Sequence, residues 1–170
     1  MADHITDPAA SRPNIPGYGI MDANSGKGLL PWTWATERLI KAHTYFIATT
    51  RPDGRPHVMP VWGIWMEGQF YFSSGRKSRK ARNLSANPKC VVSIEINGES
   101  VIVEGHVEET TEDAVLKRCS VAYTEKYQWD MGDNSEPFFK VQPSVVFGFI
   151  ENDSLFTSTA TRWTFDLDSA

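Results

Sequence analysis

The chain has 170 residues, of which 41% are hydrophobic, 12% aromatic and 22% charged, values typical of one globular domain with a sizeable core. No apolar run approaches the roughly 20 residues of a membrane-spanning helix, and residues 1–14 lack the order of a signal peptide, so we expect a cytoplasmic protein that does not enter a membrane. The net charge is −4, but residues 68–94 contain six basic and no acidic residues, so the rest of the chain carries −4 − 6 = −10. An acidic protein with a single basic stretch lacks the broad basic face that is typical of general nucleic-acid binding.

The N-terminal 31 residues are rich in Gly, Pro, Asn and Asp and show no hydrophobic period. This composition predicts an irregular N-terminal arm over residues 1–31, of the kind that wraps a partner subunit, followed by one domain over residues 32–170. The run PWTWATERLIKAH (31–43) places apolar residues near helical spacing and predicts a first helix with Thr33 as its N-cap.

Two turn sequences, RPDGRP at 51–56 and MEGQ at 66–69, separate three segments rich in β-forming residues. They predict a three-stranded meander made of residues 43–50, 57–65 and 70–74. The next segment, 73–88, reads SSGRKSRKARNLSANP and predicts a short helix that ends at Asn87, because the residue before a proline is disfavoured in a helix.

The second half of the chain continues with hairpin and helix patterns. We expect a hairpin of residues 89–95 and 100–109, a helix within 110–127, and strands at 144–152 and 160–166. Hairpin-linked strands with helices in the connections indicate a mainly β fold, an antiparallel barrel with six to seven strands and two to four helices, rather than a parallel α/β sheet.

The cysteines and histidines give no sign of a metal site. Cys90 and Cys119 form no CxxC motif, and we interpret them as buried free thiols in preference to a disulfide. The four histidines are scattered without the spacing that would place two ligands on one helix face: His4, His43, His57 and His106.

Residues 73–88 place five cations at the beginning of a predicted helix, where unpaired backbone N–H groups already carry partial positive charge. A phosphate at this position would gain backbone donors, serine hydroxyls and charge-assisted hydrogen bonds from Arg79 and Lys80. The alternative is a solvated basic face. The two hydroxyls at the end of the preceding strand, Ser73 and Ser74, and the absence of an acidic residue nearby in the sequence favour an anionic ligand.

The run FYFSSGRKSRKARNLSANPKCVVSI (70–94) resembles the cofactor-binding segment of the pyridoxamine-phosphate-oxidase-like split-barrel superfamily. That segment has an aromatic strand, a pair of hydroxyls, Arg-Lys, and then Leu and Asn-Pro before an apolar strand. ATTRPDGRPHVMPVWGIW (48–65) resembles the superfamily's first hairpin, and ATRWTF (160–165) resembles its C-terminal Arg-Trp strand. The runs KARNL (80–84) and TRW (161–163) are most similar to the flavin/deazaflavin oxidoreductase branch, whose members use coenzyme F420 or sometimes FMN.

The resemblance implies an FMN-binding type of split β-barrel and a set of residues for the cofactor phosphate. The residues implied for the phosphate are Ser73, Ser74, Arg79 and Lys80. Arg76 and Lys77 are available to the phosphate or to a polyglutamate tail of the cofactor. The resemblance further implies that the cofactor ring lies at the interface of a homodimer. The residues expected along the ring are Pro60, Val61, Trp62 and Gly63 from the first hairpin, with Arg162 and Trp163 from the C-terminal strand.

For Trp65 we favour core packing, whereas for Trp163 we favour a place beside the ring. His57 and Tyr71 alternate with core positions and are compatible with simple surface roles. Pyridoxamine-phosphate oxidase itself is a poorer match, since its substrate-binding Arg and His have no clear counterpart here beyond Arg162.

The favoured function is an F420H2-dependent oxidoreductase that moves hydride between the cofactor and a small conjugated organic substrate. The spread of five cations suits the phosphate diester and carboxylate tail of F420 better than the phosphate monoester of FMN. Two alternatives remain open: an FMN-dependent oxidoreductase like pyridoxamine-phosphate oxidase, and a non-catalytic protein that binds a flavin, F420 or haem. No catalytic residue can be named, because in such proteins the cofactor performs the chemistry.

Overall fold

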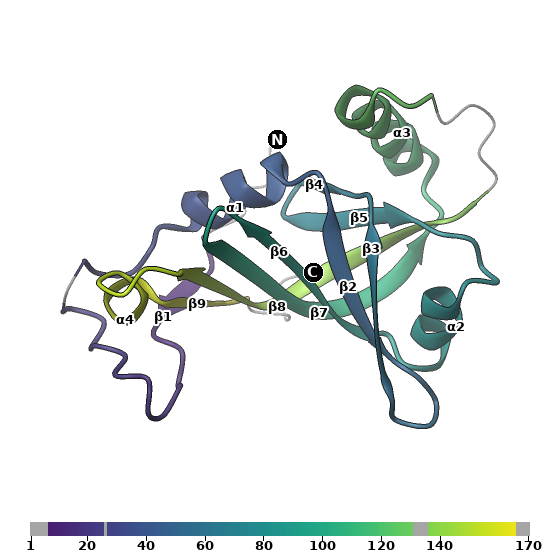
Figure 1. Cartoon of the computed structure of the whole chain (residues 1–170). Coiled ribbons are helices and arrows are strands. Elements are labelled where there is room, and N and C mark those ends of the chain that lie inside the picture. Colours follow the sequence, from purple (N-terminus) through teal and green to yellow (C-terminus); the bar gives the residue numbers. More distant parts are fainter. Residues whose placement is uncertain (1–6, 26, 131–135, 166–170) are drawn as a thin grey trace.

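The computed structural model describes residues 7–25, 27–130 and 136–165 of the chain, and Figure 1 shows its elements in sequence order. These residues form nine strands and four helices. In chain order they are β1 (Ala9–Ser11), α1 (Trp32–Lys41), β2 (Tyr45–Thr50), β3 (Pro56–Val61), β4 (Ile64–Met66), β5 (Gln69–Ser73), α2 (Arg79–Ala86), β6 (Lys89–Ile96), β7 (Glu99–Thr110), α3 (Asp113–Tyr127), β8 (Phe138–Ile150), α4 (Phe156–Thr159) and β9 (Thr161–Thr164).

The strands form one antiparallel sheet in the order β1-β9-β8-β7-β6-β2-β3, and β5 joins it through β8 while β4 pairs with β5. The long strand β8 has β7 along one edge. Its other edge is shared, because β5 pairs with residues 138–141 and β9 pairs with residues 145–148. This divided edge confirms the predicted fold class, a mainly β antiparallel split barrel.

The strand count exceeds the expected six to seven for two reasons. Strand β1 lies inside the arm that was expected to be irregular, and the expected strand 57–65 is divided at Trp62 and Gly63 into β3 and β4. The predicted three-stranded meander is therefore wrong. Strands β2 and β3 form one hairpin, β4 and β5 form a second, and β5 continues the sheet through β8 instead of pairing with β3.

The helices follow the predicted positions but not every predicted cap. Helix α1 begins at Trp32 after Pro31, so Thr33 lies inside the helix and is not its N-cap as predicted. A proline fits the start of a helix because its φ is already fixed near the helical value. Helix α2 ends at Ala86 with Asn87 as its C-cap, as the following proline predicts, and its N-cap Ser78 accepts a hydrogen bond from the backbone N–H of Ala81.

Two apolar clusters stabilise the fold. The larger one fills the sheet's inner face beneath α1 and contains Leu39, Tyr45, Phe70, Phe72 and Trp163. The smaller one lies between α3 and the β4–β5 hairpin and contains Ile64, Tyr71, Cys119, Tyr123, Tyr127 and Phe138. Both cysteines are buried and free, which confirms that prediction. The longest helix described, α3, has 15 residues, and no described helix combines the length and apolar character needed to cross a membrane.

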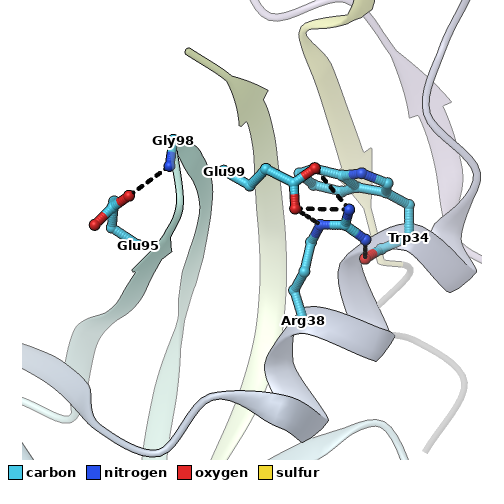
Figure 2. Close-up of polar contacts among 5 residues, drawn as sticks. All are labelled: Trp34, Arg38, Glu95, Gly98 and Glu99. Atoms are coloured by element: carbon cyan, nitrogen blue, oxygen red, sulfur yellow. Dashed lines mark hydrogen bonds and ion pairs between the residues drawn. The ribbon is translucent and has the colours of Figure 1, made fainter.

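Helix α1 is fastened to the sheet by an ion pair that Figure 2 shows in detail. The guanidinium of Arg38 donates to both carboxylate oxygens of Glu99, at 2.7 Å each, and lies 4.0 Å from the ring centroid of Trp34. It also donates to the Trp34 carbonyl at 3.0 Å. The neighbouring β6–β7 turn is closed by a hydrogen bond from Gly98 N–H to Glu95, so helix and turn are held at the same end of the sheet.

The N-terminal arm packs against its own chain over the described residues. Strand β1 pairs with β9, and the Arg12 guanidinium donates to the carbonyls of Ser158 and Ala160 at 2.9 Å. Met21 N–H donates to the Thr157 carbonyl at 3.0 Å. The arm is thus tied to α4 and β9, a set of long-range contacts that its composition alone does not indicate.

Candidate functional site

Four basic side chains converge where the β2–β3 hairpin meets the beginning of α2. His57 lies on β3, Arg51 lies in the hairpin turn, and Arg79 and Lys80 open α2. Burial lowers the pKa of His57, and the nearby positive charges of Arg51, Lys80 and Arg79 lower it further. Burial also lowers the pKa of Lys80. None of Arg51, Arg79 and Lys80 forms an ion pair within the described ranges, and the acidic residue that interacts with Arg51 at longer range is Asp53 in the hairpin turn.

The same place holds buried polar atoms that lack hydrogen bonds. Nε of Arg51 and Nδ1 of His57 are buried and have no partner among the described residues. The Asn83 side-chain Nδ2 donates to Oγ1 of Thr49 at 3.0 Å, which ties α2 to β2, but the side-chain Oδ1 of Asn83 also has no partner among the described residues. Because a buried donor without a partner is unfavourable, an arginine donor beside three other basic groups fits a bound anion.

The predicted serines lie beside this cluster. Ser74 Oγ and Ser78 Oγ are 3.0 Å apart, and Ser74 is buried. The structure thus brings Ser74, Arg79 and Lys80 to one corner, as the sequence predicts. Ser73 lies one residue earlier, at the end of β5, and is half-buried.

The expectation that no acidic residue neutralises the basic stretch is wrong for Arg76. Its guanidinium forms an ion pair with Glu109, a residue from the end of β7 that is 33 positions away in the sequence. Glu136 also approaches, since a Cβ on Gly75 would lie 3.3 Å from its carboxylate. Lys77 is exposed and has no ion-pair partner in the described ranges. Of Arg76 and Lys77, therefore, Arg76 is neutralised by an ion pair and Lys77 is not.

The backbone expected to lie along a cofactor ring is partly occupied by α3. The Trp62 carbonyl accepts a hydrogen bond from the Tyr123 phenol at 2.6 Å. Gly63 donates its N–H to Tyr127 Oη at 2.8 Å, and its carbonyl accepts from Tyr127 and from Lys126 at 3.1 Å. Val61 is buried. These polar groups of residues 62 and 63 therefore hold α3 in place.

The open backbone of this strand lies slightly earlier, at Val58 and Pro60. Arg51 N–H donates to the Arg55 carbonyl, and hydrogen-bonded pairs recur at every second position of an antiparallel ladder. His57 therefore turns its backbone toward β2, while Val58 and Pro60 turn theirs to the outer edge of β3, where no described strand pairs with it. A proline at such an edge removes one donor without breaking a ladder bond.

The two C-terminal residues expected at the ring lie elsewhere in the single chain. Trp163 is 1% exposed and packs edge-on against Trp32 with a centroid distance of 5.4 Å, so the preference for a place beside the ring is replaced by core packing. Trp65 is also in the core, as expected. Arg162 is half-buried on β9, and Figure 1 places β9 and α2 at opposite ends of the molecule.

Sequence reasoning missed several residues that shape the site. Arg51 reads as an ordinary turn residue, and His57 reads as a surface position, because their proximity to α2 depends on long-range packing. Tyr123 and Tyr127 recur at helical spacing toward the end of α3, a signal that could have shown an aromatic face directed at the barrel. No group of three or more potential metal ligands occurs within residues 7–25, 27–130 and 136–165.

The open antiparallel sheet, in which β5 and β9 share one edge of β8, places the chain in the split-barrel class of proteins. The family model described as pyridoxamine 5'-phosphate oxidase matches residues 35–149, which is more than half of the chain. The chain therefore belongs to the pyridoxamine 5'-phosphate oxidase family.

Solved structures share this fold at low sequence identity. A conserved hypothetical protein from Mycobacterium tuberculosis is 22% identical, with a TM-score of 0.66 over 73% of this chain and 87% of that one. A structure described as an F420 reductase is 25% identical, with a TM-score of 0.54 over 65% of this chain and 94% of that one. A putative pyridoxamine 5'-phosphate oxidase from Listeria innocua is 15% identical, with a TM-score of 0.56 over 67% and 91%. No curated protein matches the chain significantly in sequence.

Proposed function

We propose that the protein is an oxidoreductase that binds a phosphate-bearing tricyclic cofactor, F420 in the first place, between the β2–β3 hairpin and α2. The observation that carries this proposal is the basic corner formed by Arg51, His57, Arg79 and Lys80, with its unpartnered buried nitrogen atoms. A cofactor phosphate supplies the negative charge and the acceptor oxygens that this corner lacks.

The residues of this chain have separable roles in such a complex. Arg79 and Lys80 neutralise the phosphate, and the beginning of α2 offers it backbone N–H groups. The open backbone of Val58 and Pro60 can orient the polar edge of a ring, in place of the occupied groups of Trp62 and Gly63. The exposed side chain of Met59 shields the ring from water. The bound cofactor supplies hydride transfer to a small conjugated organic substrate.

Three observations bear on the choice of cofactor. The likeness to a structure described as an F420 reductase supports F420, as do Lys77 and Arg82, which have no ion-pair partner in the described chain and could meet an anionic tail. The ion pair of Arg76 with Glu109 favours FMN, because it removes one cation from the set available to a tail. FMN is therefore the second candidate, within the same site.

We further propose a homodimer with the cofactor at the subunit interface. In one chain, Arg162 is far from the basic corner, and only a partner subunit can bring its guanidinium near a cofactor held there. The β2–β3 hairpin also exposes Phe46 and Val58, which lie on the same face of the two paired strands and form an apolar surface at the edge of the sheet.

Binding titrations of F420 and FMN test the proposal. Arg79→Ala and Lys80→Ala should each weaken cofactor binding by about 1.5–3 kcal/mol, the scale of a lost charge-assisted hydrogen bond, with little change in stability. Arg118→Ala, which removes an exposed arginine paired with Glu67 on α3's side of the barrel, is the matched control. Parental affinity in both site variants would show that the corner is only a solvated basic face.

The same titrations at two ionic strengths separate the cofactors. If F420 is the ligand, Lys77→Ala should weaken F420 more than FMN and reduce the salt dependence of F420 binding, because an ion contact to the tail is lost. FMN retained through purification, with no measurable F420 affinity, would overturn the F420 assignment. Tight binding of reduced cofactor without oxidation by any conjugated acceptor would leave a non-catalytic carrier.

A further inference from the structure

A pocket lies away from the basic corner and is lined by residues of α1, β4 and α3, and Figure 1 shows β4 between the two helices. Its volume is about 330 Å³, at the small end of ligand pockets. Four of its six lining side chains are apolar, and the remaining two come from successive residues of α3: Ile40, Ile64, Trp65, Ala122, Glu125 and Lys126.

The amine of Lys126 is held by two acceptors. Nζ lies 2.6 Å from Oη of Tyr45 and 3.1 Å from the Gly63 carbonyl oxygen. The Tyr45 hydroxyl donates its own proton to the Leu39 carbonyl, so its oxygen can only accept from Lys126. A neutral amine has two N–H groups and one lone pair. With both N–H groups engaged, the lone pair takes the remaining tetrahedral direction, which has no partner among the described residues.

Burial lowers the pKa of Lys126 to about 8. At pH 7 roughly a tenth of such amines are neutral, whereas an ordinary exposed lysine with a pKa of about 10.4 is neutral at well under a thousandth. The titratable groups in contact with the Lys126 amine are the phenols of Tyr45 and Tyr127, whose pKa values burial raises, and Glu125 lines the same pocket. Both phenols are therefore neutral at pH 7, and they leave the amine as the nucleophile of this pocket.

We propose that Lys126 is a covalent capture site for small apolar aldehydes, which bind in the α1–β4–α3 pocket and form an imine with its amine. The nitrogen lone pair attacks the carbonyl carbon, a C–N bond forms, and a proton moves from nitrogen to the former carbonyl oxygen. The hydroxyl then leaves as water with a second proton from nitrogen, and a C=N bond replaces it. One aldehyde and one amine give one imine and one water, with no oxidant or reductant.

Reductive trapping tests this assignment in the full chain. The protein is incubated at pH 7 with isobutyraldehyde and sodium cyanoborohydride, and each lysine's alkylation rate is measured by peptide mass mapping. Lys126 should be modified at least tenfold faster than Lys117, an exposed lysine on the same helix. Equal rates at the two positions would overturn the proposal. Lys126→Arg, which keeps the charge and donors, should remove the fast adduct.

A pocket-filling variant separates binding in the pocket from amine reactivity alone. Ala122→Leu adds three carbon atoms to the pocket wall and should slow isobutyraldehyde at Lys126 at least fivefold more than it slows formaldehyde, which needs little space. Lys80, the other lysine whose pKa is lowered by burial, lies at the basic corner and should react equally in parent and variant. A rate for isobutyraldehyde unchanged by Ala122→Leu, in a protein with parental circular dichroism, would overturn the pocket's role.

Discussion

His57 combines two effects that act in the same direction on its imidazole. Burial disfavours the charged form, and the positive charges of Arg51, Lys80 and Arg79 disfavour it again, so the pKa lies below the usual value near 6.5. Its Nδ1 is buried without a partner in the described chain. A bound phosphate would neutralise the surrounding cations and offer an acceptor, and both changes favour the protonated ring.

We therefore expect cofactor binding to be linked to proton uptake at His57. The bound-state pKa exceeds the free-state pKa, so affinity should rise as the pH falls from 8 to 6.5, by at most about tenfold per pH unit for one proton. Calorimetric titrations in two buffers of different ionisation enthalpy measure the uptake. His57→Gln should flatten the profile. A profile that is identical in parent and variant would show that His57 does not face the phosphate. The window ends at pH 6.5 because an FMN phosphate itself titrates near pH 6.

At the scale of elements, the break between β3 and β4 decides where the chain can offer backbone to a ligand. Gly63 lies at this break, and a Cβ there would lie 2.2 Å from Cζ of Phe70, a fully buried core ring. The break has only a weak sequence signal, the isolated Gly63 in the run HVMPVWGIW, and that run contains no turn dipeptide. The break is imposed by Tyr123, Tyr127 and Lys126, residues some 60 positions further along the chain.

Gly63→Ala should lower the free energy of unfolding by about 1–3 kcal/mol, because the added methyl group overpacks a core that cannot yield. Urea unfolding followed by tryptophan fluorescence measures the change. Gly75→Ala is the matched control, since its new Cβ would meet only the flexible carboxylate of Glu136 at 3.3 Å, and we expect a change below about 0.5 kcal/mol. Equal effects at the two positions would contradict the close packing inferred at Gly63.

Helix α2 shows which features of an element are local. Its position and its end before Pro88 follow from neighbouring residues, and both were predictable. The ion pair of Arg76 with Glu109 was not, because β7 reaches the basic stretch only through the pairing of β7 with β8 and of β8 with β5. Sequence reasoning therefore located the cations correctly and overestimated how many of them are free.

At the scale of the whole molecule, turn signals and β-rich segments were sufficient to predict an antiparallel barrel, whereas the partition of the β8 edge between β5 and β9 was not visible. The same limit explains Trp163. A tryptophan on a C-terminal strand can face a ligand or the core, and the choice is made by Trp32 and by Gly148, where a Cβ would lie 2.8 Å from the Trp163 ring. Trp32 and Trp163 are more than 100 residues apart in the sequence, so local sequence patterns carry no information about their contact.

The exposed apolar face of the β2–β3 hairpin leads us to expect that the chain forms a homodimer. Phe46 on β2 and Val58 on β3 lie on the same face of the hairpin, and Val58 is 55% exposed. An exposed apolar patch of this kind is typical of a subunit interface. Because the basic corner borders the same hairpin, loss of the interface should also weaken cofactor binding.

We expect a homodimer by sedimentation velocity at micromolar concentration, and a shift toward monomer in Val58→Asp. Burying an unpaired carboxylate in an apolar interface costs several kcal/mol, so dimer dissociation should become at least about 100-fold easier. Val121→Asp is the matched control, because Val121 is 59% exposed but lies on α3, away from the hairpin. The variant at Val58 should lose cofactor affinity together with dimerisation, while the control keeps both. A parental chain that stays monomeric, or a monomeric Val58→Asp with full cofactor affinity, would contradict a site shared between two subunits.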